Sequence, residues 1–252
     1  MKFGQDASLR LCEATSLPKG ERGSHAKMFL DVKRSSPLPK RISAGRGVGG
    51  EVRCAKCYDA HMSQGKLVLI IGPSGVGKSV ILKALKAKHP EYVFPRSATT
   101  RARRAGESDD LYHFVSEENF SKWWKEGEFL EWAQVHKGAR YGTLVSEIIP
   151  AIKQGKTVIR EVDVQGFQSI RCHPYFASGK TYKLYTIFIL PESEEQLLKH
   201  IQGRAPMAPE ELRRRIGSMK KELAVAPETD VQIKNIEGKL AETIAQVEKA
   251  IA

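Results

Sequence analysis

The sequence predicts an α/β fold, a parallel sheet covered by helices, and two observations lead to this class. From residue 66 onward, short runs of β-branched and aromatic residues alternate with longer helix-forming stretches. The strongest apolar run, Leu67–Ile71, leads through a glycine-rich loop into a helical pattern. Strands that alternate with helices in this way are typical of parallel sheets.

Eight elements can be assigned from the pattern, in chain order. Leu67–Ile71 is expected to be a buried strand, and Lys78–Lys88 a helix that stops before His89-Pro90, because proline disfavours helical backbone in the residue before it. The further strands are Phe129–Val135, Lys156–Val164 and Lys183–Leu190. The further helices begin at the capping box Ser193–Gln196 and cover Pro209–Ala224 and Glu237–Ala252.

Residues 1–61 differ from the rest of the 252-residue chain. They carry 12 basic and 6 acidic residues and no lasting apolar periodicity, which favours a flexible basic extension. An over-called start codon, with Met62 as the true start, is the alternative, and residues 62–252 then form one domain. A transit peptide fits the Arg and Ser content but not the acidic residues. Cys54, Cys57 and His61 lack a second pair at zinc-like spacing, so no zinc is expected.

Charge and hydropathy limit the classes of partner. The net charge of +12 favours polyanions, whether nucleotides, nucleic acid or an acidic membrane surface. No apolar run approaches the ~20 residues of a transmembrane helix. Four cysteines are too few for a disulfide framework, so a cytoplasmic location is expected. Trp123, Trp124 and Trp132 are expected to be packing residues, which makes a nucleic-acid partner the weaker hypothesis.

The sharpest motif is a phosphate-binding loop. Residues 72–79 match G-x-x-x-x-G-K-[ST] between a strand and a helix, the context that this motif requires. Glycines let backbone N–H groups surround phosphate oxygens, and the helix adds its positive dipole end. Lys78 is expected to reach the β- and γ-phosphates of a nucleoside triphosphate, and Ser79 to bind Mg²⁺. The predicted loop residues are Gly72, Pro73, Ser74, Gly75, Val76, Gly77, Lys78 and Ser79.

An acceptor site is indicated further along the chain. Arg101 and Arg104 lie three residues apart beside hydroxyl side chains, a cluster suited to a phosphate monoester. A solvated basic loop is the alternative reading of this stretch. The motifs Y-x-F-V at residue 112, G-E-F-L-E-W at residue 127 and Y-G-T at residue 141 follow.

Taken together, these motifs resemble those of guanylate kinases over residues 66–251. The resemblance implies a P-loop NTPase core, a small GMP-binding α+β subdomain near residues 96–155 and a helical lid near 202–215. It implies transfer of a phosphoryl group from ATP to GMP, with Mg²⁺. It leaves open the choice between GMP and dGMP, and the oligomeric state.

The resemblance also assigns roles by position. The GMP phosphate is matched by Ser97, Arg101, Arg104, Tyr112 and Tyr141, and the guanine base by Glu131, Thr143 and Asp163. Arg204 and Arg215 match lid arginines, and Asn235 matches a position near the adenine of ATP. Lys78, Arg101, Arg204 and Arg215 are the expected catalytic residues. No protein base is needed, because the attacking phosphate oxygen is already ionised.

Two residues depart from the family pattern, and one rival function remains. Arg160 stands where an apolar residue is usual and needs a partner, and Glu161 replaces an aspartate near the metal. Scaffold proteins carry guanylate-kinase-like domains that bind peptides and no longer catalyse. Those domains commonly lose the phosphate loop and the acceptor arginines, which are present here.

Overall fold

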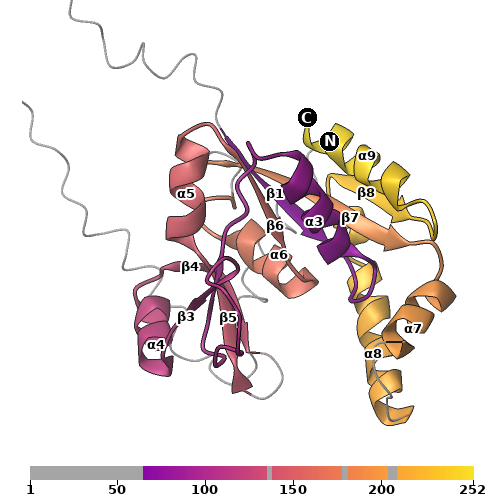
Figure 1. Ribbon diagram of the computed structural model, residues 1–252, viewed down its shortest axis with the longest axis horizontal. Helices are drawn as coiled ribbons and strands as arrows, with labels where there is room; N and C mark the ends of the chain where they lie inside the picture. The colour runs from indigo at the N-terminus through magenta and orange to yellow at the C-terminus, as the bar shows by residue number, and fades with distance from the viewer. Residues whose placement is uncertain (1–64, 135–137, 178–180, 204–208) are drawn as a thin grey trace, which may run out of the picture. The chain divides into compact units, whose positions relative to one another are not determined.

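The computed structural model describes residues 65–134, 138–177, 181–203 and 209–252. The expected extension 1–61, with Cys54, Cys57 and His61, lies outside them. Four parallel strands form the central sheet in the order β6-β1-β7-β8 (Figure 1). Their bounds are Thr157–Glu161 for β6, Lys66–Ile71 for β1, Lys183–Pro191 for β7 and Val231–Asn235 for β8. This sheet confirms the predicted fold class.

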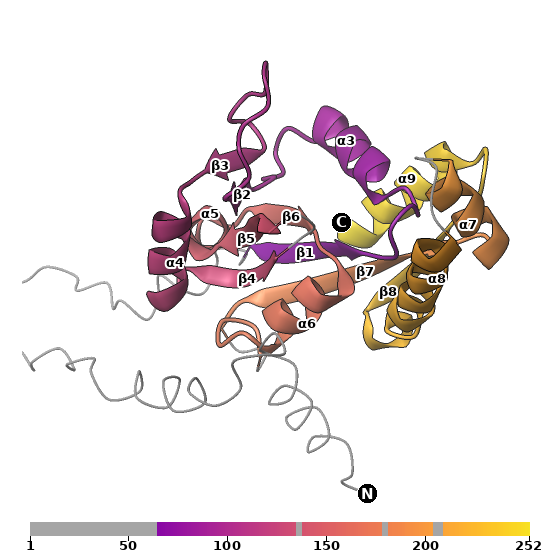
Figure 2. The ribbon, with the colours of Figure 1, turned by 90° about the horizontal axis from the view of Figure 1, so that it is seen from below.

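Helices cover both faces of the central sheet. α3 (Lys78–Lys88) and α9 (Leu240–Ile251) pack on one face, and α5 (Val145–Lys153) and α6 (Val164–Cys172) on the other. Figure 2 shows α3 and α6 on opposite sides of β1. Because successive side chains of a strand point to opposite faces, β1 contributes to both apolar clusters and is buried along Leu67–Ile71. None of the helices in the described ranges is long and apolar enough to cross a membrane.

A second, mixed sheet has the strand order β3-β2-β5-β4. β2 (Ser97–Thr99) and β3 (Tyr112–Phe114) are parallel, and β5 (Arg140–Leu144) pairs antiparallel with β2 and with β4 (Phe129–Gln134). Helix α4 (Glu117–Lys125) covers one face of this sheet. Its other face is therefore left for polar side chains.

The packing of α4 is aromatic. Phe120 is fully buried, and its ring stacks on that of Phe129 with centroids 4.5 Å apart. Trp123, Trp124 and Trp132 pack around this pair. The tryptophans are thus packing residues, as the sequence predicted.

The segment expected to form the lid, near residues 202–215, takes in the last residue of one helix and the first residues of the next. α7 covers Glu194–Gln202, α8 covers Pro209–Leu223, and a 3-10 turn, Ala226–Glu228, leads on to β8. Ser193 caps α7 by accepting a hydrogen bond from Gln196 N at 3.2 Å. The Gln196 side-chain oxygen accepts a hydrogen bond from Glu192 N at 2.9 Å. In a standard capping box the donor is the N-cap residue, here Ser193, so the contact falls one residue earlier.

Several predicted boundaries are wrong for identifiable reasons. The strand expected over Lys156–Val164 ends at Glu161, because Asp163 caps α6 through a 2.7 Å hydrogen bond from Gly166 N. The last helix begins at Leu240 rather than Glu237, since Gly238 adopts a left-handed conformation with φ of 77°. The sequence pattern did not predict the strands β2, β3 and β5 or the helices α4, α5 and α6. Each of these elements is too short for its periodicity to be recognised.

Gly142 allows close packing inside the second sheet and gives the first prediction. A Cβ atom there would lie 2.6 Å and 2.7 Å from ring atoms of Phe129. We expect Gly142→Ala to lower the free energy of unfolding by about 1–3 kcal/mol, the usual effect of overpacking. Urea denaturation of the wild-type protein and the variant measures this change in the free energy of unfolding. Gly217→Ala on α8, where a Cβ meets nothing within 4 Å, is the control and should be neutral or slightly stabilising. Equal losses in both variants would contradict the packing argument.

Candidate functional site

The glycine-rich loop between β1 and α3 is shaped by two neighbouring elements. Gly72 and Gly77 have φ angles of 152° and 100°. A Cβ on Gly72 would lie 2.6 Å from Ile189 O, and one on Gly77 would lie 2.8 Å from Asn235 Nδ2. Only glycine fits at these two positions, so the loop backbone can turn its N–H groups toward a phosphate.

Lys78 and Ser79 follow the loop at the start of α3 and meet an acid from β6. Lys78 Nζ donates to Gly72 O at 2.7 Å and to Pro73 O at 3.1 Å, and it lies 4.0 Å from Glu161 Oε1. The Ser79 hydroxyl lies 3.1 Å and 3.3 Å from the two Glu161 oxygens. A hydroxyl beside a carboxylate provides the hard oxygen ligands that Mg²⁺ prefers, so these two residues fit that ion.

Three further residues hold the loop from other elements. Asn235, at the end of β8, donates to Val76 O at 2.9 Å and accepts from the Thr243 hydroxyl at 3.1 Å. On α7, His200 Nδ1 donates to Gly75 O at 3.2 Å. On α8, the Glu222 carboxylate accepts from Ser74 N–H. Burial raises its pKa, although Lys78 and that hydrogen bond oppose the rise.

Four residues predicted to contact GMP form one row across the second sheet, here called the acceptor row. Strand pairing sets Tyr112 opposite Ser97, Ser97 opposite Thr143, and Thr143 opposite Glu131. Their neighbours Ala98, Leu144 and Trp132 belong to the cluster under α4. Since side chains alternate along a strand, the acceptor row occupies the face away from α4.

Glu131 ends this row in a half-buried position against the start of α6. It accepts a hydrogen bond from the Thr143 hydroxyl. A Cβ on Gly166 would lie 3.6 Å from the Glu131 carboxyl carbon and 3.3 Å from Asp163 Oδ1, so the two acids are neighbours. Burial raises the pKa of Glu131 and Asp163 raises it further, while Arg160 and the Thr143 hydrogen bond oppose this.

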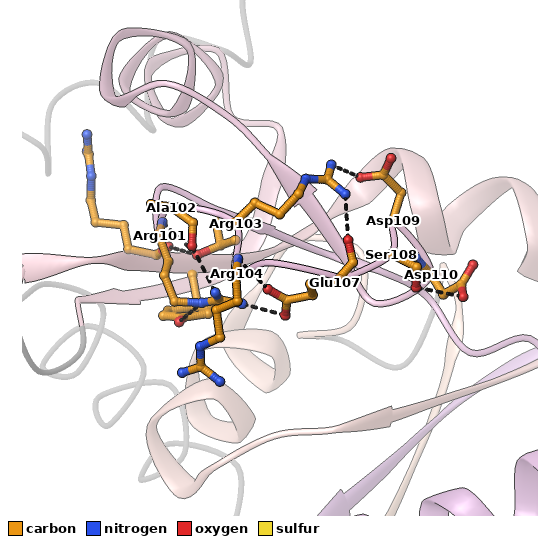
Figure 3. Close-up of polar contacts among 11 residues, drawn as sticks. Arg101, Ala102, Arg103, Arg104, Glu107, Ser108, Asp109 and Asp110 are labelled. Atoms are coloured by element: carbon orange, nitrogen blue, oxygen red, sulfur yellow. Dashed lines mark hydrogen bonds and ion pairs between the residues drawn. The ribbon is translucent and has the colours of Figure 1, made fainter.

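The arginine cluster (Figure 3) meets the other end of the row through Arg101, which lies against Tyr112. Arg101 donates to the Tyr141 hydroxyl at 3.1 Å and to Glu107 at 2.7 Å, and its guanidinium lies 5.4 Å from the centre of the Tyr112 ring. The backbone N–H of Arg104 also donates to Glu107 at 3.1 Å, and its guanidinium points away from that acid. Glu107 therefore organises the whole turn.

Of the two expected lid arginines, the structure describes Arg215, whose partner is on its own helix. On α8, Arg215 Nη2 lies 2.8 Å from Glu211 Oε1, one helical turn away on the same helix. Arg204 lies outside the described residues. Its assignment and the lid role of Arg215 stay predictions.

Comparison with known proteins is consistent with this arrangement. The family model described as Guanylate kinase matches residues 64–252. The guanylate kinase of Trichormus variabilis is 39% identical over 174 residues, covering 69% of this chain and 83% of that protein. The chain belongs to the guanylate kinase family. The guanylate kinase of Nocardia farcinica is 37% identical over 179 residues, covering 70% of this chain and 89% of its own.

A solved guanylate kinase supports the fold. The crystal structure of the enzyme from Anaplasma phagocytophilum superposes with a TM-score of 0.53 at 23% identity. The match covers 74% of this chain and 84% of that one.

Sequence reasoning missed two acids of this guanylate kinase family site. Glu107 lies in the arginine segment, and an acid three residues after Arg104 was the available signal. Glu222 has no local signal, because only the packing of α8 brings it to Ser74. Arg160 and Glu161, noted as departures from the family, both lie at the site.

Asn235 offers a prediction that separates two roles. The resemblance places it near adenine, whereas its contacts here are with the loop and Thr243. Losing one hydrogen bond costs about 0.5–1.5 kcal/mol, so we expect Asn235→Ala to raise the KM of ATP by about 2- to 10-fold. If Asn235 acts by supporting the loop, the KM of GTP, used in place of ATP as the phosphate donor, should rise by the same factor. A variant impaired with ATP and unchanged with GTP would contradict this and favour adenine contact.

Proposed function

We infer that the chain transfers the γ-phosphoryl group of ATP to GMP and forms ADP and GDP. Its family membership supports this activity. The assignment of roles to residues rests on β6. Two consecutive residues of this strand contact the acceptor row and the phosphate loop, the two halves of the site, here called half-sites. Arg160 Nη2 lies 2.6 Å from Ser97 of the acceptor row, and the Glu161 carboxylate lies 3.1 Å from Ser79 beside the phosphate loop. The two half-sites therefore adjoin at one edge of the central sheet.

On the donor side, the loop residues 72–77 bind the triphosphate through their N–H groups, and Lys78 adds a positive charge. Ser79 and Glu161 would hold Mg²⁺. When bound, the ion neutralises charge on the β- and γ-phosphates. Arg204 and Arg215 complete the positive field when the lid approaches.

On the acceptor side, Glu131 identifies the base. Guanine presents N1–H and a 2-amino group side by side, and an ionised carboxylate accepts both hydrogens. Thr143 and Asp163 support the same contact. Ser97, Arg101, Arg104, Tyr112 and Tyr141 hold the phosphate of GMP.

The reaction forms one P–O bond and breaks another. An oxygen of the GMP phosphate attacks the γ-phosphorus, and the bond to the bridging oxygen breaks, so that ADP leaves with the electron pair. Because the attacking oxygen carries no proton at neutral pH, the protein needs no general base. Its residues align the two phosphates and neutralise the developing charge.

A peptide-binding domain without catalysis is the rival reading of the fold. Such a domain has no need for a lysine, a hydroxyl and an acid at the phosphate loop, or for paired arginines at the acceptor. Lys78, Ser79, Arg101 and Arg104 are all present in the chain, and the first three make the contacts described above. This observation favours the enzyme.

ADP formation measured with each nucleoside monophosphate in turn tests the function. We expect turnover with GMP, with dGMP compared in the same series, none with AMP, and none after chelation of Mg²⁺. Lys78→Met should lower kcat by about 10²–10³-fold, the usual effect of losing one group that stabilises transition-state charge. The exposed Lys83 of the same helix supplies the control, Lys83→Met, which should be unaffected. ADP formation independent of GMP would count against the proposal.

Base recognition should depend on pH through Glu131. Because burial raises the pKa of this carboxyl, its ionised fraction falls as pH drops through the raised value. The KM of GMP should therefore rise as the pH falls, which gives the pH profile of kcat/KM for GMP an acid limb. Glu131→Gln should lower kcat/KM for GMP by about 10- to 150-fold, the equivalent of about 1.5–3 kcal/mol for a charged hydrogen bond, and abolish this acid limb. Glu128→Gln, an exposed change nearby, should keep both the rate and the limb. An unchanged limb in Glu131→Gln would assign the pH effect to another group.

A further inference from the structure

Arg160 is the least expected residue of the central sheet. It lies on β6 beside β1, opposite Leu69, where strands of a parallel sheet usually carry apolar side chains. Its Nε atom is buried and has no hydrogen-bond partner among the described residues. Nη1 donates to Pro95 O at 3.3 Å, and Nη2 donates to the Ser97 hydroxyl at 2.6 Å. A half-buried cation with a fully buried Nε is retained here although an apolar residue would fill the position.

The surroundings of this guanidinium belong to the acceptor row. Ser97 is a member of the row, and Tyr112 and Glu131 at its two ends also act on the Arg160 charge. Glu161 and Glu147 are the other acids whose charges act on it. Around Glu131 the charged groups are Arg160 from β6 and Asp163 from the start of α6. Of these, Arg160 alone favours the ionised form of Glu131.

The hydrogen bond to Ser97 has a direction with consequences. Arginine can only donate, so the Ser97 oxygen accepts from Nη2. The Ser97 hydrogen must then point elsewhere, and it remains available as a donor to a ligand oxygen. An apolar residue at position 160 would leave this hydroxyl free to rotate.

We propose that Arg160 is a positioning residue of the GMP site, which fixes the Ser97 hydroxyl as a donor and supplies the positive charge that balances Glu131. The proposal rests on the proposed function, since it assigns a task within recognition of GMP. It gives the departure from the family pattern a purpose in binding.

The test compares Arg160→Met with Arg160→Lys. The steady-state constants for GMP and ATP are measured between pH 5.5 and 8.5. Loss of a charged hydrogen bond predicts that Arg160→Met raises the KM of GMP by about 10- to 150-fold while the KM of ATP stays within twofold. The acid limb of kcat/KM for GMP should move to higher pH. Arg160→Lys should restore the position of the limb through its charge.

Arg171→Met controls for loss of a structural arginine, because Arg171 on α6 pairs with Glu228 at 2.8 Å, away from the acceptor row. It should leave the KM of GMP and the acid limb unchanged. Thermal melts and calorimetric titration with GMP verify that each variant is folded and binds as its kinetics indicate. Should Arg160→Met fail to fold, Arg160→Leu, with the branched apolar side chain, replaces it.

Two outcomes would overturn the proposal. One is an Arg160→Met enzyme with the wild-type KM for GMP and the wild-type acid limb. The other is an equal rise in the KM of GMP and ATP with no movement of the limb, which is the result of a purely structural role. Failure of the wild-type chain to phosphorylate GMP is a separate result, because it would reject the proposed function before any variant is compared.

Discussion

The register of β5 between β2 and β4 is the constraint on which the acceptor half of the site depends. Ser97, Thr143 and Glu131 share a face because these strands pair as they do. A slip of one residue would turn Thr143 toward α4 and bring the apolar Leu144 to the ligand side. The aromatic packing under α4, with Phe120 at its centre, opposes such a slip. Apolar contacts on the face covered by α4 therefore determine which polar side chains the opposite face presents.

Partial burial of charge is the second constraint on the acceptor row. Glu131 accepts from the Thr143 hydroxyl. Arg160 donates to Pro95 O and to the Ser97 hydroxyl, so each ion has hydrogen-bond partners of its own. Removing such partners leaves an uncompensated charge and is costly. Apolar residues of similar volume would serve stability equally well. Under the proposed function, these charges therefore serve recognition of the ligand rather than stability of the fold.

Sequence reasoning succeeded where a local pattern reports a local structure and failed where distant packing decides. The loop from Gly72 to Ser79 needs only its glycines and its flanking strand and helix, all visible in the sequence. The end of β6 could not be read, because the β-branched Val162 and Val164 continue a strand pattern while the Asp163 cap starts a helix. The meeting of Arg160 with Ser97 joins residues 63 positions apart and follows only from strand order. Glu222 shows the same limit, since α8 must fold back before it can meet Ser74.

Polar groups around the phosphate loop have partners within the protein. Lys78 bonds to loop carbonyls, Glu222 lies near Ser74 N–H, and on α8 Arg215 pairs with Glu211. A pair such as Arg215 with Glu211, partly exposed and one helical turn apart, is worth only about 0.3–0.5 kcal/mol. Charge-assisted bonds from a guanidinium to phosphate are stronger than that. A triphosphate can therefore displace an internal partner of this kind.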